Sequence, residues 1–457
     1  MINTTDDTIV ALSTPSGVGA LAVIRLSGKN AVLIVNQLFF GKNLEKQSSH
    51  TIHVGTIRHA GEVLDEVVIS LFLAPRSFTR EDVVEVSCHG SPFIVQQLLT
   101  LFVQQGARLA TPGEFTKRAF LHGRLDLAQA EAVADLIASE SRRAYQVAMD
   151  QMRGGFSQQI KLLRDQLVYF ASLVELELDF SEEDVEFADR KQLQELVEDI
   201  RGVILQLMNS FAAGNVIKNG VPTVIAGKPN VGKSTLLNAL LNEEKAIVSD
   251  IPGTTRDFIE DEITLQGVLF RFIDTAGIRE AEDRIEMIGV QRTHEKIQQA
   301  SVVLYLIDLE RGTLESIKKE HEWLLQVGKP FVLVGNKVDR AASELLDELK
   351  GVGDIVYISA EKKHNLEELR NHLIELLTLY QLNENEGTIV TNTRHFTSLQ
   401  QTYRALESIM NGLQTEISHD FLAQDIRHAL YYLGEITGEV TNDDLLDTIF
   451  SKFCIGK

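Results

Sequence analysis

The chain has 457 residues, 44% of them hydrophobic, and this length predicts about three domains that each bury an apolar core. Its formal net charge of −21 argues against a broadly basic nucleic-acid-binding protein, although a local basic patch could still contact RNA. Because it has two cysteines, an N-terminus unlike a signal peptide and no apolar run near ~18 residues, we expect a cytoplasmic protein with free thiols and no membrane span.

Residues 1–120 are predicted to form a small α+β domain. Short β-like runs separated by glycine-containing turns lie at Thr8–Leu12, Gly19–Leu26, Val67–Leu73 and Val83–Ser87. Arg25 and Glu85 lie in two of these runs, and Arg124 follows them. Arginine and glutamate side chains together could hold a ligand that carries both carboxylates and ring N–H donors. Surface ion pairs are the simpler interpretation of the same spacing, and both interpretations stay open.

The remainder of the chain is predicted to combine helical segments with an α/β domain. Residues 121–215 look almost wholly helical, with Leu163, Leu167, Phe170 and Val174 at the spacing of a core stripe. Residues 216–380 alternate strand-like and helical stretches, and helical texture resumes over 381–457, where Leu406, Ile409 and Leu413 share one face. The simplest architecture inserts the α/β domain, with a mostly parallel sheet, into one discontinuous helical domain built from both flanks.

The C-terminal segment is Phe453-Cys454-Ile455-Gly456-Lys457. A cysteine fourth from the end suggests prenylation, but the residues after it fit that signal poorly. Apolar Phe450, Phe453 and Ile455 favour an end that docks on the protein over a disordered tail. A docked Cys454 thiol would be a candidate catalytic group if its pKa were depressed.

The segment Gly227-Lys228-Pro229-Asn230-Val231-Gly232-Lys233-Ser234 fits G-x-x-x-x-G-K-[ST], the loop that wraps nucleotide phosphates. An apolar run, Val221–Ala226, precedes it and a helix-favouring run, Thr235–Leu241, follows it, as the motif requires. The glycines let backbone N–H groups and the helix N-terminus face the anion. We expect Lys233 to reach the β- and γ-phosphates and the Ser234 hydroxyl to bind Mg²⁺.

Three later segments complete the pattern of a guanine-nucleotide site. A strand-like run ends at Asp274-Thr275-Ala276-Gly277, where the carboxylate can hold Mg²⁺ through water and the glycine N–H can meet the γ-phosphate. Another run ends at Asn336-Lys337-Val338-Asp339, whose carboxylate can accept two hydrogen bonds from guanine. Ser359-Ala360-Glu361 would add a backbone contact to the base. Their order and spacing match the translation-factor class of GTPases.

One position departs from Ras-like GTPases. Ile278 stands where those enzymes place the glutamine that orients the attacking water, so another group must position water and neutralise charge. Thr255 offers a second Mg²⁺ ligand. The Asn230 side-chain oxygen, with carbonyls near Ser249 and Ile251, could hold a monovalent cation that acts electrostatically like an arginine finger. A loop-stabilising Asx turn explains Asn230 equally well.

Over essentially its whole length the sequence resembles the tRNA-modification GTPase family known as MnmE or TrmE. Besides the nucleotide motifs, the resemblance rests on Ser77-Phe78-Thr79 with Glu81-Asp82, Pro112-Gly113-Glu114-Phe115, Leu125-Asp126-Leu127-Ala128-Gln129-Ala130-Glu131-Ala132, Glu435-Ile436-Thr437-Gly438-Glu439 and the Cys-Ile-Gly-Lys ending.

For the domain at 216–380, the resemblance implies a K⁺-stimulated GTPase whose G domains meet in a dimer. The K⁺ ligands match Asn230, Ser249, Ile251 and Thr254. Glu286 matches a residue that helps to align the attacking water, and Arg279 matches one that ties the switch region together. The full set of positions expected to contact the nucleotide or its ions is Asn230, Val231, Gly232, Lys233, Ser234, Thr235, Ser249, Asp250, Ile251, Pro252, Gly253, Thr254, Thr255, Asp274, Thr275, Ala276, Gly277, Asn336, Lys337, Asp339, Ser359, Ala360 and Glu361.

For the N-terminal domain, the resemblance implies homodimerisation and a site for 5-formyltetrahydrofolate or a related folate at Arg25, Glu85, Arg124 and Lys457. The family works with a flavoprotein that supplies FAD, commonly called MnmG or GidA, in a heterotetramer or larger assembly. The pair adds an aminomethyl or carboxymethylaminomethyl group to C5 of the wobble uridine at tRNA position 34. Cys454 matches the family's terminal cysteine, whose catalytic role stays open.

Two other classes of function remain compatible with the residues. One is a ribosome-associated switch GTPase, which a strongly basic appended domain would favour, and the sequence shows none. The other is a folate-dependent one-carbon transferase with a vestigial GTPase part. Intact Lys233, Asp274 and Asp339 argue against such decay.

Overall fold

The structure, a computed structural model, describes residues 7–179, 190–245, 261–273, 297–377, 388–415 and 419–456. The chain forms two compact units. One comprises Met1–Ile137, Ala148–Arg201 and Gln401–Lys457, and the other comprises Ala138–Val147 and Gly202–Gln400. The second unit thus consists of two stretches that interrupt the first, and each unit is described by itself.

The N-terminal part of the first unit contains a seven-stranded sheet with the strand order β3-β4-β5-β6-β2-β1-β7. Its neighbouring strands are antiparallel, except that β1 and β7 are parallel. The strands are β1 (Thr8–Leu12), β2 (Leu21–Ser27), β3 (Phe39–Phe40), β4 (Thr51–His59), β5 (Glu62–Phe72), β6 (Val83–His89) and β7 (Ala107–Leu109). The runs expected at the start of the chain are therefore strands, with slightly different ends.

Two helices, α1 (Ala31–Leu38) and α2 (Pro92–Gln104), cover one face of this sheet. The 3₁₀ helix η1 (Leu44–Lys46) follows α1 along the chain. Side chains alternate along the strands, so Ile24 and Leu26 of β2 enter the core under the helices. Arg25, between them, must point to the opposite face, which positions it for a polar role.

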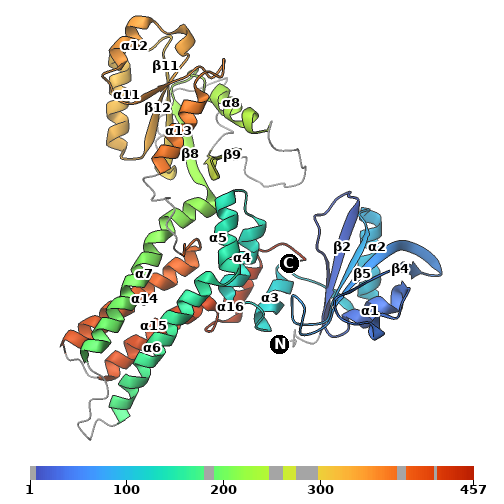
Figure 1. Cartoon of the computed structure of the whole chain (residues 1–457). Coiled ribbons are helices and arrows are strands. Elements are labelled where there is room, and N and C mark those ends of the chain that lie inside the picture. The colour runs from blue at the N-terminus through green and yellow to red at the C-terminus, as the bar shows by residue number, and fades with distance from the viewer. Residues whose placement is uncertain are drawn as a thin grey trace. The chain divides into compact units, whose positions relative to one another are not determined.

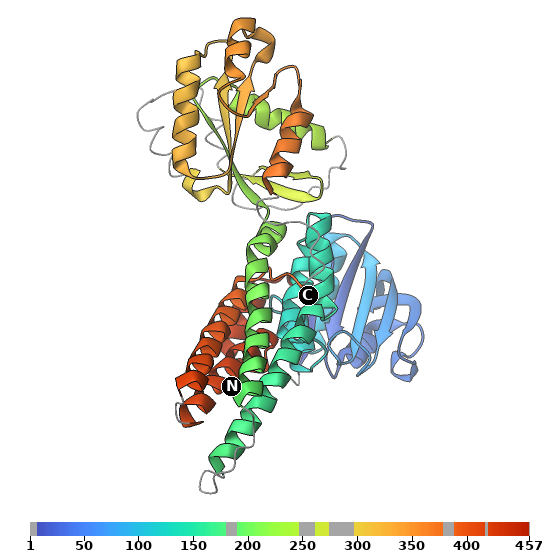
Figure 2. The ribbon, with the colours of Figure 1, turned by 60° about the vertical axis from the view of Figure 1, so that its left-hand side comes forward.

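Helices make up the rest of the first unit. They are α3 (Glu114–Leu121), α4 (Leu127–Ile137), α6 (Gly155–Asp179), α15 (His419–Thr437) and α16 (Asp443–Phe450), with parts of α5 (Arg142–Met152), α7 (Arg190–Asn219) and α14 (Thr393–Thr415), which also reach the second unit. Figures 1 and 2 show α6 and α15 side by side. The predicted stripes are buried: Leu163, Leu167, Phe170 and Val174 on α6, and Leu406, Ile409 and Leu413 on α14.

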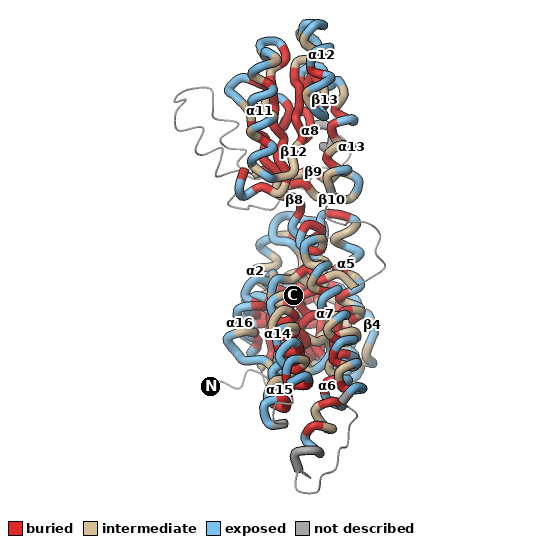
Figure 3. The backbone as a smooth tube through the Cα atoms, turned by 90° about the vertical axis from the view of Figure 1, so that its left-hand side faces the viewer, coloured by how far each residue is buried: buried red, intermediate tan, exposed pale blue. Residues whose placement is uncertain are grey.

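The second unit is built on a six-stranded sheet with the order β13-β12-β11-β8-β10-β9, in which only β9 runs antiparallel to its neighbour. Its strands are β8 (Val221–Gly227), β9 (Asp261–Leu265), β10 (Val268–Phe272), β11 (Val302–Asp308), β12 (Phe331–Asn336) and β13 (Ile355–Tyr357). Its further helices are α8 (Lys233–Lys245), α11 (Leu314–Val327), η2 (Val338–Arg340), α12 (Ser343–Leu349) and α13 (Leu366–Leu377). The central strands β11 and β12 are buried along nearly their whole length (Figure 3).

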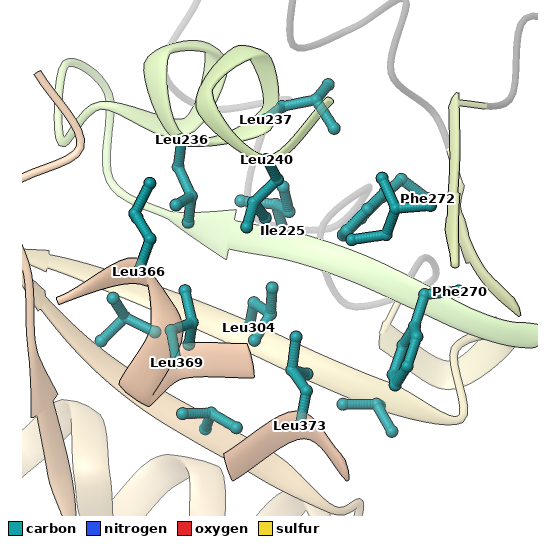
Figure 4. Packing of buried hydrophobic residues seen from close by; sticks show 14 of the residues in the cluster. Ile225, Leu236, Leu237, Leu240, Phe270, Phe272, Leu304, Leu366, Leu369 and Leu373 are labelled. Atoms are coloured by element: carbon teal, nitrogen blue, oxygen red, sulfur yellow. The ribbon is translucent and has the colours of Figure 1, made fainter. Parts of the chain in front are cut away.

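Helices cover both faces of this sheet, which explains the uniformly apolar strands. On one face, α8 and α13 contribute Leu236, Leu240 and Leu369 to a core with Phe270 and Leu304 from the strands (Figure 4). On the other face, α11 and α12 close a second core. The parallel strands therefore end at a common edge, where ligands of such sheets bind.

The C-terminal segment docks on the first unit, but not through all the residues that we predicted. Phe450 is buried, and Phe453 packs on it with ring centroids 5.2 Å apart. Ile455 is 60% exposed, so the prediction that it anchors the end is wrong. Backbone contacts hold this segment instead, because the Cys454 carbonyl accepts a 3.3 Å hydrogen bond from the N–H of Gly113.

Candidate nucleotide-binding site

The glycine-rich loop joins the end of β8 to the start of α8. Its backbone is left-handed at Asn230 (φ 62°), and Gly227 and Gly232 also have positive φ, 141° and 99°. A Cβ at Gly227 would collide with the Leu306 carbonyl, and one at Gly232 with the Asn336 amide nitrogen. The loop therefore needs glycine at both positions, for conformation and for space.

Lys233 begins α8 and folds back over the loop. Its ammonium donates to the carbonyls of Gly227 (2.9 Å) and Lys228 (2.8 Å). Burial lowers its pKa, because the surroundings favour the neutral amine. Ser234 and Thr235 are exposed in the first turn, and the Val231 side chain is anchored in the core. Lysine and hydroxyl groups thus surround the N-terminus of α8, a natural anion site.

Asn336, at the end of β12, ties the glycine-rich loop to the later loops. Its amide nitrogen donates to the Val231 carbonyl at 2.8 Å, and its oxygen accepts from the Ala360 N–H at 3.0 Å. The side chain is 3% exposed. One buried amide therefore fixes the spacing between the segment at the phosphate end and the segments that we predicted to contact the base.

The segments that we predicted to contact the base lie together after β12 and β13. Lys337 (φ 64°) forms a 2.6 Å ion pair with Asp308 at the end of β11. Asp339 accepts a hydrogen bond from the Ser359 hydroxyl and pairs with Lys362, and these donors lower its pKa. The carboxylate is therefore ionised at neutral pH, as a hydrogen-bond acceptor for guanine must be. Glu361 points to another partner, a 2.7 Å pair with Arg340.

The other predicted nucleotide and ion ligands lie outside the described residues. They are Ser249, Asp250, Ile251, Pro252, Gly253, Thr254, Thr255, Asp274, Thr275, Ala276, Gly277, Arg279 and Glu286, and Lys457 of the predicted folate site joins them. Within the described residues, no cluster of three or more histidine, cysteine or carboxylate side chains could hold a metal.

A second candidate site lies on the face of the N-terminal sheet opposite α1 and α2. Arg25 and Glu85 are cross-strand partners, and the guanidinium meets Glu85 Oε1 through Nε (2.9 Å) and Nη2 (2.7 Å). The rings of Phe78 and Phe115 lie 5.7 and 5.8 Å from the guanidinium carbon. The Gly456 carbonyl accepts from Arg25 at 3.5 Å, which brings the C-terminal segment to the same place.

Sequence reasoning missed the aromatic clamp of this site. Phe78 and Phe115 belong to motifs that carried the family resemblance, and this was the available signal. Arg124, in contrast, lies exposed in the turn after α3, and no hydrogen bond or ion pair links it to Arg25 or Glu85 in the part of the chain that the structure describes. Cys454 is exposed near these residues, with its carbonyl bound and its thiol open to solvent.

A buried ionic network supports the loops beside this site. Arg118, 5% exposed, meets the carboxylates of Asp7, Glu81 and Glu114. Arg108 also pairs with Glu114, at 2.6 Å. Burial raises the Glu114 pKa, but hydrogen bonds from Arg108 and from the Thr111 N–H outweigh it and lower the pKa to about 2. The network therefore ties the segment that carries Glu81 to the start of α3, where Glu114 is ionised.

Comparison with known proteins identifies the family. A profile described as the MnmE helical domain matches residues 127–454, and one described as the GTP-binding protein TrmE N-terminus matches residues 8–124. The tRNA modification GTPase MnmE of Cytophaga hutchinsonii is 57% identical over 451 residues, covering 99% of this chain and 98% of the relative. That of Flavobacterium psychrophilum is 52% identical over 464 residues, covering 99% of both chains.

The chain belongs to the MnmE family of tRNA modification GTPases. The resemblance drawn from the sequence is thereby confirmed, and so is the N-terminal, helical and G-domain architecture of MnmE proteins. As an MnmE protein, the chain is a GTP hydrolase that acts in tRNA modification. Among solved structures, the G domain of the T. maritima FeoB iron transporter is 26% identical, covering 34% of this chain and 98% of that chain at a TM-score of 0.25. In the described ranges no helix has the length and apolarity to cross a bilayer.

Proposed function

We propose that this MnmE protein hydrolyses GTP in a K⁺-stimulated reaction that requires two G domains to pair. The observation that supports its guanine-nucleotide site is the Asn336 link, which ties the phosphate loop to the segment that contains Ser359, the hydrogen-bond partner of Asp339. The backbone N–H groups around Lys233 receive the phosphates, and Asp339 selects guanine.

The proposed ions fit the donor set of the glycine-rich loop. Ser234 and Thr255 would hold Mg²⁺, with Asp274 acting through water, and the exposed Ser234 hydroxyl lies at the start of α8 as this requires. Asn230, with Ser249, Ile251 and Thr254, would hold K⁺. Bound K⁺ supplies positive charge near the phosphates, where Ile278 offers no hydrogen bond. Glu286 aligns the attacking water, and Arg279 orders the switch region.

The GTPase cycle serves tRNA modification with a flavoprotein partner of the MnmG type. We propose that the homodimer and this partner add an aminomethyl or carboxymethylaminomethyl group to C5 of the wobble uridine, and that they do so in the cytoplasm, where that substrate occurs. We propose three domains for the chain. The N-terminal dimerisation domain spans residues 1–120, the helical domain combines 121–215 with 381–457, and the G domain spans 216–380.

A reduced folate of the 5-formyltetrahydrofolate type is the proposed one-carbon cofactor. The Arg25–Glu85 pair fits such a group, because the carboxylate can accept from ring N–H donors while the guanidinium binds an anionic or carbonyl oxygen. Phe78 and Phe115 hold the guanidinium in place by cation–π contact. Arg124, Lys457 and Cys454 complete the proposed set. A bound folate would supply the one-carbon unit.

Analysis of tRNA nucleosides tests the proposal directly. Cells that lack this protein should lose the C5-modified wobble uridine, and the wild-type gene should restore it. Lys233→Ala should restore none, because it abolishes nucleotide binding. Glu286→Ala should bind GTP normally but turn it over at least tenfold more slowly. Unchanged nucleosides in the deletion strain would exclude the proposed role, and normal turnover in Glu286→Ala would exclude that of Glu286.

A further inference from the structure

The loop that follows Ser359-Ala360-Glu361 is a tight turn on the base side of the nucleotide site. Ser359 and His364 exchange backbone hydrogen bonds of 3.2 and 3.0 Å across it, and the Asn365 amide donates to the Tyr357 carbonyl at 3.0 Å. The turn therefore fixes the backbone of Lys362, which lies between these anchors.

The Lys362 side chain reaches from this turn to Asp339. Its ammonium lies 3.0 Å from Asp339 Oδ2. The Asp339 side chain is 12% exposed, whereas that of Lys362 is 63% exposed. The pair thus joins a carboxylate that is mostly covered to a solvated side chain that can move away from it.

We propose that the Lys362 ammonium reversibly blocks the Asp339 carboxylate that recognises guanine, and that it must move away before a guanine nucleotide can bind. It thereby limits the association rate of guanine nucleotides. The proposal rests on the guanine site proposed above. Guanine presents N1–H and N2–H₂ side by side, so it needs both Asp339 oxygens in one plane. An ammonium at hydrogen-bond distance from Oδ2 competes with a guanine N–H donor for that oxygen, which Arg340 Nε approaches only to 3.8 Å.

The size of the effect follows from the exposure of Lys362. An exposed ion pair is worth only a small factor in an equilibrium, so the site is open for a fraction on the order of one third to one fifth of the time. When only that fraction of molecules can accept the base, the apparent dissociation constant rises by the inverse of the fraction. Lys362 therefore weakens guanine nucleotide binding about threefold to fivefold, through association rather than dissociation.

Stopped-flow binding of a fluorescent GDP to the full-length protein tests this inference. Lys362→Met should raise the association rate constant about threefold to fivefold and leave the dissociation rate constant unchanged. Lys362→Arg keeps the charge and should behave like the wild type. Lys363→Met removes the same charge from the neighbouring exposed residue, and it should not speed association. Higher ionic strength should shrink the difference between Lys362→Met and the wild type.

The same substitution in an Asp339→Asn variant tests whether Lys362 acts through the Asp339 carboxylate. Asp339→Asn replaces an acceptor with a donor and should shift preference from guanosine to xanthosine diphosphate. In that background Lys362→Met should no longer accelerate association of fluorescent xanthosine diphosphate. Equal or slower GDP association in Lys362→Met than in the wild type, or equal acceleration in Lys363→Met, would overturn the inference. Failure of the wild-type protein to bind GDP at all would instead overturn the proposed function.

Discussion

The Asn336 side chain makes two hydrogen bonds that link separate loops. It is buried, it holds the Val231 carbonyl and it receives the Ala360 N–H. Removing it leaves both backbone groups buried without a partner, which costs more than the two hydrogen bonds themselves contribute. Its role is therefore structural, and it also sets the spacing between the two loops that we propose to bind one nucleotide.

Asn336→Ala should lower the stability of the G domain by about 2 kcal/mol and weaken GDP binding at least tenfold. Urea unfolding and fluorescence titration with GDP measure the two effects. Asn371→Ala, at an exposed position on α13, is the matched control and should change neither. Normal GDP affinity in Asn336→Ala would show that the loops keep their spacing without this amide.

Glu114 shows how a sequence motif can serve folding. Its pKa falls from 4.5 to about 2 on folding, so its ionised form stabilises the native state above about pH 5, and this contribution is lost as the pH falls from there through about 2. Glu114→Gln should therefore destabilise the first unit by about 2–3 kcal/mol at pH 7 and by roughly half as much near pH 3, where the native carboxylate is still mostly ionised. Thermal unfolding at both pH values measures this.

The control for Glu114 is Glu66→Gln, which makes the same charge change at an exposed position on β5. It should leave the unfolding temperature nearly unchanged at either pH. An equal loss for Glu114→Gln at pH 7 and pH 3 would indicate that its shape, and not its charge, matters to the network.

Among the elements, the C-terminal segment depends on the backbone of one glycine. Gly456 has φ 93°, and a Cβ there would collide with the Leu12 carbonyl at the end of β1. Its own carbonyl accepts from Ser13 Oγ at 3.3 Å. A side chain at 456 would therefore release the segment from β1, although α16 would still pack through Phe450.

Gly456→Ala should increase amide hydrogen exchange over residues 452–456 at least tenfold, while exchange within α16 stays close to that of the wild type. Peptide-level mass spectrometry resolves these two segments. Gly351→Ala, where a Cβ would meet nothing within 4 Å, is the control and should not alter exchange at the C-terminus. Wild-type protection of residues 452–456 in Gly456→Ala would mean that the segment is held by other contacts.

These elements also show what could be predicted from the sequence. The strands β8, β10 and β12 and the apolar stripes on α6 and α14 could be predicted, because the spacing of apolar residues within each segment is enough to indicate them. The glycine-rich loop was predictable because its residues act within one turn. The exposed position of Ile455 was not, because apolar character alone does not tell whether the side chain or the backbone makes the contact.

Long-range ionic contacts were also beyond the sequence. Arg118 meets Glu81 and Asp7 from distant positions in the chain, and no spacing rule relates them. The Lys362–Asp339 pair extends from a turn in which Lys363 and Asn365 have positive φ, a conformation that local propensity disfavours in non-glycine residues. The sequence suggested that Arg25 and Glu85 could share a ligand site. That they lie directly opposite each other on β2 and β6 became clear only from the pairing of the strands.

At the scale of the whole molecule, the chain has the residues expected to bind GTP but lacks the glutamine that orients the attacking water in Ras-like GTPases. The helix α7 contributes residues to both compact units, so the chain passes from one to the other without a loop. The G domain holds Lys233 over the glycine-rich loop and an ionised Asp339, the two groups proposed to bind the phosphates and the guanine of GTP. At the position of the water-orienting glutamine, however, Ile278 can supply neither charge nor a hydrogen bond.

The missing polar group should make turnover depend on the cation and on a second subunit. Replacing K⁺ by Na⁺ at constant ionic strength should lower kcat at least tenfold and leave GTP affinity unchanged, because the cation acts on charge that develops in the transition state. In K⁺ the turnover per subunit should rise with protein concentration until the G domains are paired. Steady-state phosphate release, measured over a range of protein concentrations in each salt, tests both.

Lys233→Ala should be inactive in both salts, which excludes a contaminating GTPase. Equal kcat in K⁺ and Na⁺ would mean that protein groups alone replace the glutamine, and a turnover independent of concentration would mean that one G domain is sufficient.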